Sequence, residues 1–142
     1  MSNIMEVKFS AKSENESLAR VIAASFAAKL DPTLDEIADI KTAVSEAVTN
    51  AIIHGYDEDE SKFVYLKCKL DNNSIEIIVE DEGNGIEDVD LAMQPLYTSK
   101  PELERSGMGF SVMESFMDDV TVSSIKDEGT KIVMTKKINL PE

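Results

Sequence analysis

Alternation of apolar and polar positions predicts strands along much of this chain. Near its start Met5, Val7 and Phe9 alternate with polar residues, the period of two that a strand with one buried face requires. Comparable strand patterns occupy residues 62–70, 74–81, 119–125 and 130–137. The segments 71–73 and 126–129 are rich in Asp, Asn and Gly, which predicts two hairpins.

Between the first two strands the apolar spacing changes to that of helices. Ser13 and Glu16 predict a capping box, and Asp31-Pro32 predicts the end of the first helix. The expected buried row of this helix is Leu18, Val21, Ile22, Phe26 and Leu30. A second helix is expected over about 34–54, with Gly55 as a left-handed residue that ends it.

A long irregular stretch follows the strand 74–81 and reaches Ser106, which is typical of a lid or a binding loop. A helical pattern then resumes over 109–117 before the last hairpin. Mostly hairpin-linked strands with interspersed helices predict an α+β two-layer sandwich, a mostly antiparallel mixed sheet with helices on one face. We expect a single domain over residues 1–142.

Composition limits the partners. The chain has 142 residues with 42% hydrophobic positions, which suits one hydrophobic core. Its net charge of −14 repels nucleic acid and anionic membranes, so a phosphate ligand needs backbone amides, a few placed cations or a metal ion. Cys68 is the one cysteine, which excludes an internal disulfide. Without a leader pattern or a long apolar run, we expect a cytoplasmic protein with no nucleic-acid or membrane partner.

Three polar residues follow one another at four-residue spacing in the second helix. Glu46, Asn50 and His54 form one column beside the apolar stripe of that helix. A carboxylate, an amide and an imidazole there are candidates for an acid or base, a metal ligand and an orienting group. A wetted helix edge has the same pattern, and His54 also suits a structural position near a helix C-terminus.

The strand 74–81 ends in a motif that suits a ligand. Asp81 has the inward parity of that strand, so its carboxylate needs a donor such as a purine amine, a backbone amide or water. Gly83 and Gly85 flank Asn84, which allows a sharp turn and a close approach to a planar ligand. Thr130 follows Gly129 with inward parity, beside Asp81 or as an ordinary strand threonine.

A second glycine motif lies where the lid enters the third helix. Gly107, Met108 and Gly109 would leave backbone amides free to bind phosphate, and two glycines there also occur as simple caps. Arg105 and Lys100 could add positive charge. The motifs match neither the dinucleotide-binding fingerprint nor the Walker sequence.

Taken in this order and spacing, the motifs over residues 46–130 resemble the ATP-binding core of gyrase-type ATPases, Hsp90 chaperones, sensor histidine kinases and mismatch-repair ATPases. Nearly the whole chain is similar to the anti-sigma-factor serine kinases of spore-forming bacteria, in its small size and in Glu46 placed four residues before Asn50. The resemblance implies the Bergerat-type ATP-binding fold, with ATP and Mg²⁺ as cofactors.

The resemblance also implies residue roles. Glu46 would be the general base, Asn50 the Mg²⁺ ligand and Asp81 the acceptor for the adenine amine. The other implied cofactor-binding residues are His54, Gly83, Gly85, Arg105, Gly107, Met108, Gly109 and Thr130. Phosphoryl transfer depends mainly on positioning and charge neutralisation, which agrees with a carboxylate at Glu46.

The function implied is an anti-sigma factor that binds and inhibits a sporulation sigma factor and phosphorylates an anti-anti-sigma factor on serine. We expect a homodimer, a partner surface on the first helix, and Arg20 as a candidate contact there. Two alternatives remain, an ATP hydrolase clamp and a nucleotide-gated binding module without kinase activity. Replacing Glu46 by Gln would distinguish the kinase from the binding module.

Overall fold

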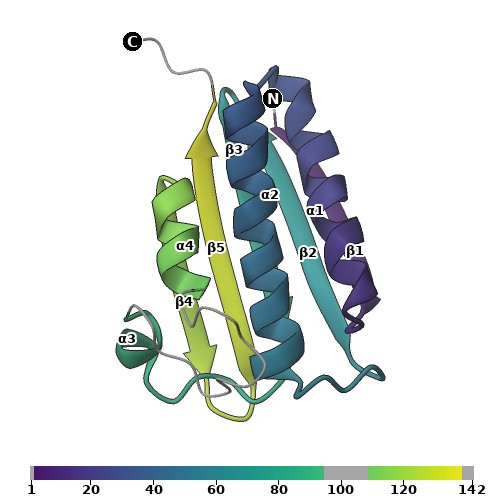
Figure 1. Cartoon of the computed structure of the whole chain (residues 1–142), viewed down its shortest axis with the longest axis vertical. Helices are drawn as coiled ribbons and strands as arrows, with labels where there is room; N and C mark the ends of the chain where they lie inside the picture. The colour runs from purple at the N-terminus through teal and green to yellow at the C-terminus, as the bar shows by residue number, and fades with distance from the viewer. Residues whose placement is uncertain (1, 95–108, 139–142) are drawn as a thin grey trace.

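A computed structural model describes residues 2–94 and 109–138, which form two layers (Figure 1). One layer is a five-stranded sheet in the order β1-β2-β3-β5-β4. Its strands are β1 (Ser2–Ser10), β2 (Phe63–Asp71), β3 (Ser74–Asp81), β4 (Asp119–Ile125) and β5 (Gly129–Lys137). The predicted antiparallel sheet is confirmed, but every pairing among the described strands is antiparallel, so they form no mixed sheet.

The helices lie on one face of this sheet (Figure 1), which confirms the predicted two-layer arrangement. They are α1 (Glu14–Ala27), α2 (Leu34–Thr49) and α4 (Gly109–Phe116), with a 3-10 turn η1 (Ala28–Leu30) and a π-helical segment η2 (Asn50–Gly55). A short helix α3 (Val89–Ala92) lies in the stretch predicted to be irregular, and four residues are too few for a periodic signal. None of the helices in the described parts of the chain is long and apolar enough to cross a bilayer.

The capping box predicted at Ser13 is wrong. Ser13 itself has helical backbone angles and its side chain makes no capping hydrogen bond, whereas an N-cap residue needs an extended backbone. The box forms instead at the start of α2, where Thr33 Oγ1 accepts from Glu36 N at 3.1 Å and Glu36 Oε1 accepts from Thr33 N at 2.8 Å. Asp31 adopts the left-handed conformation, so the predicted end of the first helix is confirmed.

The predicted buried row of α1 is partly wrong. Leu18 and Val21 are 53% and 50% exposed, and the buried positions are Phe26 and an alanine series. These alanines are Ala19, Ala23, Ala24 and Ala27. Alanine has no side chain beyond Cβ, so this face allows α1 to lie close to its neighbour α2. Figure 1 shows the two helices side by side. The larger apolar side chains therefore lie on the outer face of α1.

The core lies between α2 and the inner side of the sheet. From α2 it receives Ile40, Val44 and Val48, each 0% exposed. The strands add Val64, Leu66, Ile75, Ile77, Val79, Ile132 and Met134. Cys68 is part of this layer, as predicted, and burial raises the pKa of its thiol to about 12. This thiol is a small apolar core group rather than a nucleophile.

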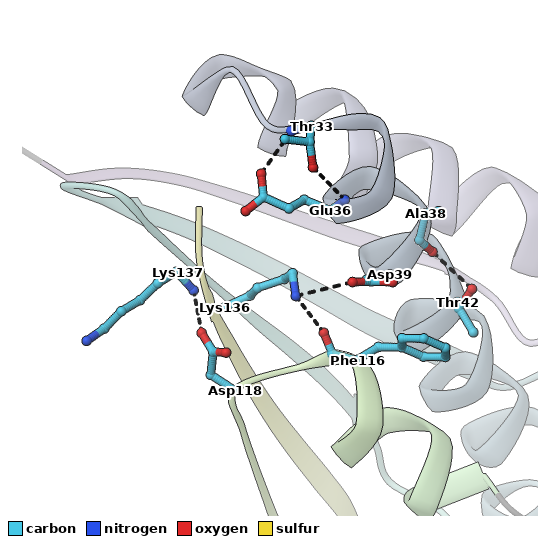
Figure 2. A network of polar contacts seen from close by, with 9 residues as sticks. All are labelled: Thr33, Glu36, Ala38, Asp39, Thr42, Phe116, Asp118, Lys136 and Lys137. Carbon is cyan, nitrogen blue, oxygen red and sulfur yellow. Dashed lines mark hydrogen bonds and ion pairs between the residues drawn. The ribbon is translucent and has the colours of Figure 1, made fainter. Parts of the chain in front are cut away.

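One end of α4 is fixed to both layers (Figure 2). Lys136 Nζ donates to the carbonyl of Phe116, in the last turn of α4, at 2.8 Å and pairs with Asp39 of α2 at 3.5 Å. The backbone amide of Lys137 donates to Asp118 at 2.7 Å. Lysine near a helix C-terminus neutralises the negative end of the dipole. This network anchors α4 far from the end of the sheet where β3 finishes.

Candidate nucleotide site

The polar column lies at the point where α2 changes into the π-helical segment η2. Asn50 N donates to the carbonyl of Glu46, so these two residues are one α-helical turn apart as predicted. Beyond Asn50 the pattern changes, because Tyr56 N donates to Ala51 O at 3.0 Å, five residues back. The expectation of a regular α-helix to His54 is therefore wrong, since a π-turn is wider than an α-turn.

The three column residues are nevertheless partly buried, which confirms their position at the boundary between core and solvent. Single π-turns inside α-helices occur frequently at functional sites. Here the wider turn carries the chain from the column to Gly55, against the end of β3. The roles of Glu46, Asn50 and His54 stay predictions.

Gly55 approaches Asp81 closely, and this contact explains why glycine is needed there. A Cβ built on Gly55 would lie 2.8 Å from the carboxyl carbon of Asp81. Gly55 is not among the residues with positive φ, so the expectation of a left-handed cap is wrong. The helix end is shaped by the space that the carboxylate takes, rather than by a backbone conformation.

Asp81 is the most distinctive ionisable group of this region. It is 4% exposed at the end of β3, which confirms its inward parity. Burial raises the pKa of its carboxyl to about 6, although hydrogen bonds from the backbone of Gly83 and Thr130 lower it. The bond from Gly83 N to Asp81 Oδ1 is 2.9 Å long. A buried carboxylate that two backbone amides stabilise only in part still favours a further donor.

The glycine loop after Asp81 is held between two other segments. A Cβ on Gly83 would lie 2.0 Å from the carbonyl oxygen of Gly55, and one on Gly85 would lie 2.2 Å from that of Ile125. Gly85 also has a φ of +72°, a conformation that favours glycine. The two glycines are thus explained by contacts within the protein, and their predicted approach to a planar ligand stays a prediction.

Asn84 connects this loop to both neighbours. Its amide N donates to Gly55 O at 2.7 Å, and its side-chain Nδ2 donates to Asp57 at 2.9 Å. Its own carbonyl accepts from Asp127 N at 2.6 Å. The predictions from sequence gave no role to Asn84, although an asparagine between two glycines is a usual sign of a turn.

Tyr56 is another residue that the sequence did not reveal. Its hydroxyl donates to Phe63 O at 2.6 Å and accepts from Glu82 N at 2.7 Å. Burial is the largest cause that raises the pKa of this phenol. Tyr56 therefore joins the end of η2, the start of β2 and the residue after Asp81, and its only signal in the sequence is an aromatic residue beside Gly55.

Thr130 lies directly across from Asp81 in the β3–β5 pairing and is 5% exposed, so its predicted inward position beside Asp81 is confirmed. Its hydroxyl is 2.9 Å from the hydroxyl of Ser124 on β4. Ser124 also accepts from Ile86 N at 2.6 Å and lies 3.0 Å from the carbonyl of Gly129. Ser124 was not predicted, and its signal is inward parity at the end of β4.

Gly109 begins α4, as predicted for the start of the third helix. The other residues of that motif, Arg105, Gly107 and Met108, lie outside the described residues, as does Lys100. The predicted anion site at this helix start therefore stays a prediction.

The side chains near Asn50 can be compared with the needs of Mg²⁺. Within residues 2–94 and 109–138, no group of three or more His, Cys, Asp and Glu is arranged to hold a metal ion. Mg²⁺ often takes only one or two protein oxygens and completes its shell with phosphates and water. The amide oxygen of Asn50, one turn from the carboxylate of Glu46, fits that mode of binding and not a closed metal site.

Arg20 lies on the exposed side of α1. Its Nη1 is 3.5 Å from Ser45 Oγ on α2 and 4.0 Å from Glu16 Oε1. The guanidinium is thus held beside the residue that precedes Glu46. Its predicted contact with a partner protein stays a prediction.

Comparison with known proteins agrees with this architecture. Residues 9–136 match the family model described as a histidine kinase-like ATPase domain. The crystal structure of the RsbU and RsbW domains of a Mycobacterium tuberculosis protein has the same fold, with a TM-score of 0.68 at 17% identity. That alignment covers 96% of this chain and 32% of the other.

Curated relatives match at much higher identity. The anti-sigma F factor of Clostridium perfringens is 63% identical over 98% of this chain and 99% of its own length. The anti-sigma F factor of Clostridium acetobutylicum is 61% identical over 100% of this chain and 99% of its own. That of Oceanobacillus iheyensis is 56% identical, with 98% and 95% covered. The chain therefore belongs to the anti-sigma F factor family, within the histidine kinase-like ATPase domains.

Proposed function

We propose that this protein binds ATP with Mg²⁺ beside α2 and the end of β3, transfers the terminal phosphoryl group to a serine of an anti-anti-sigma factor, and also binds and inhibits a sporulation sigma factor. The observation that supports this most is the carboxylate of Asp81, which is 4% exposed in a chain of the ATPase-domain family. A carboxylate held so far from water suits a ligand that donates a hydrogen bond from a planar base.

The proposed roles follow the positions of the residues. Asp81 and Thr130 contact the adenine from neighbouring strands, and Asn50 contributes an oxygen to Mg²⁺, which neutralises phosphate charge. Glu46 accepts the proton of the attacking serine hydroxyl, the serine oxygen bonds to the terminal phosphorus, and the bond to the bridging oxygen breaks to release ADP. The phosphates are assigned to Arg105, Gly107, Met108 and Gly109, with Gly83 and Gly85 shaping the base pocket and His54 nearby.

Family membership and the surface of α1 support the proposed partners. Leu18 and Val21 are half exposed on that helix, on either side of Arg20 in sequence. Exposed apolar side chains rimmed by charge are typical of protein contacts. We assign this surface to a homodimer or to the sigma factor, and the anti-anti-sigma factor to the side of the nucleotide. We assign the protein to the cytoplasm together with these proposed partners.

The test is incubation with γ-labelled ATP and Mg²⁺, with and without the candidate anti-anti-sigma protein, followed by mapping of the labelled residue. We expect label on one serine of that protein. Glu46→Gln should abolish the transfer and keep ATP binding, while Glu60→Gln, a change in an exposed acidic turn, should leave transfer unchanged.

Three other outcomes would contradict the kinase proposal. Steady phosphate release without an acceptor would indicate an ATP hydrolase clamp. Full sigma-factor control in Glu46→Gln without any labelled protein would indicate a nucleotide-gated binding module. Absence of ATP binding would remove the nucleotide site as well.

A further inference from the structure

Ser124 stands at the end of a row of three polar side chains. In the sheet it lies directly opposite Thr130, and Thr130 lies directly opposite Asp81. All three have the inward parity of their strands and are buried or partly buried. Side chains directly opposite one another have Cβ atoms about 4.5 to 5.5 Å apart. Ser124 therefore reaches Asp81 only through Thr130.

The three contacts of the Ser124 hydroxyl determine where its proton lies. The amide of Ile86 can only donate, so Ser124 Oγ accepts there at 2.6 Å. The carbonyl of Gly129 can only accept, so Ser124 donates to it at 3.0 Å. A serine hydroxyl has one proton and two lone pairs. Toward Thr130, at 2.9 Å, Ser124 has only a lone pair left.

It follows that Thr130 donates its own proton to Ser124. Thr130 Oγ1 then offers only lone pairs to anything else beside it. Its neighbour Asp81 is also an acceptor when ionised, and one of its oxygens already accepts from Gly83 N. The end of β3 and the start of β5 therefore present two buried acceptors side by side. Two acceptors can both accept hydrogen bonds from a primary amino group, which has two N–H donors. They repel a carbonyl oxygen, which is itself only an acceptor.

We propose that Ser124 is a positioning residue that holds Thr130 as an acceptor and so makes the site select a 6-amino purine over a 6-oxo purine. This inference rests on the proposed nucleotide binding. It assigns selectivity to a hydroxyl that does not itself touch the base. Without Ser124 the Thr130 proton can rotate toward the ligand and donate to a 6-oxo group, which removes one of the two opposing contacts.

The experiment measures the dissociation constants of ATP and ITP with Mg²⁺ by calorimetry, for the full chain and four variants. ITP carries an oxo group in place of the 6-amino group. In Ser124→Ala we expect the preference for ATP over ITP to fall about tenfold, mostly through tighter ITP binding. Ser124→Thr keeps the hydroxyl and should retain the preference of the natural protein.

Thr130→Val is the matched control at the neighbouring position. It removes the acceptor, so ATP binding should weaken, and it cannot donate, so ITP binding should gain less than it does in Ser124→Ala. If Ser124→Ala does not fold, Ser124→Cys takes its place in the comparison of ATP with ITP, because a thiol is only a weak donor and acceptor. A general loosening of the glycine loop would change both nucleotides alike and leave their ratio constant.

An unchanged ratio in Ser124→Ala, or in Ser124→Cys where that is used, would overturn the role of Ser124 while leaving ATP binding established. ITP binding by Thr130→Val as tight as that by Ser124→Ala would also overturn it, because no proton donated by Thr130 would then be needed. If the natural protein bound neither nucleotide, both this inference and the proposed function would be wrong.

Discussion

The raised pKa of Asp81 makes the stability of the nucleotide-free protein depend on pH in a direction unusual for an aspartate. Burial takes the pKa of this carboxyl from 3.8 to about 6. Since the folded value is the higher one, the folded protein binds more protons between these limits, and the free energy of unfolding falls as pH rises. At about 1.4 kcal/mol per pH unit, the gap corresponds to about 3 kcal/mol. Asp81 is 4% exposed, so solvent screening reduces this little.

Asp81→Asn removes the titration and keeps an oxygen that can accept from Gly83 N. The assay is urea unfolding of both proteins without nucleotide, from about pH 3.5 to 7.5. We expect the difference in unfolding free energy to move by about 3 kcal/mol in favour of the variant as pH rises through this range. All other carboxyl groups are common to both proteins, so their contributions cancel in the difference.

Asp90→Asn, at an exposed aspartate of α3, is the matched control, and its stability should follow that of the natural protein at every pH. Parallel profiles for Asp81→Asn and the natural protein would refute the reasoning, because Asp81 would then lose little hydration on folding. A difference that moved in the opposite direction would mean that the amides of Gly83 and Thr130 outweigh burial.

Three further changes test the packing around the site by chemical unfolding. Gly83→Ala places a Cβ 2.0 Å from the carbonyl oxygen of Gly55, so we expect a loss of about 3 kcal/mol or more. Tyr56→Phe leaves the amide of Glu82 without its 2.7 Å acceptor and should cost about 1 to 3 kcal/mol. Lys136→Met removes the contact that fixes the last turn of α4, and should cost about 1 kcal/mol and raise hydrogen exchange there.

Much of the fold could be predicted because local patterns and tertiary structure agree. Strand parity alone placed Asp81 and Thr130 on the inner side of the sheet, and both are buried. The strand that contains Asp81 ends at that residue, as its pattern indicated. Period-two alternation reports on burial directly, because each side chain of a strand faces one layer.

Features that depend on the spacing between backbones could not be predicted. The sequence of residues 50–55 does not distinguish a π-turn from an α-turn. The wider turn accompanies the close approach of Gly55 to Asp81, a contact between segments that are distant in sequence. In α1 the apolar pattern favoured Leu18 and Val21, but the close packing of α1 on α2 selected the smaller alanines. Ser124 has inward parity, but parity alone does not distinguish it from other strand residues until its three partners are known.

The contacts around Asp81 show how a site that destabilises the free protein would still favour the proposed ligand. Gly55, Gly83 and Gly129 let backbone segments approach so closely that the carboxylate loses its water. The free energy of removing this water is spent during folding, which also fixes the position of Asp81 before any ligand arrives. Binding therefore loses little conformational entropy at this residue. A donor from the proposed nucleotide would then restore a hydrogen bond that water can no longer supply. The same packing that lowers the stability of the empty protein is what would favour the bound nucleotide.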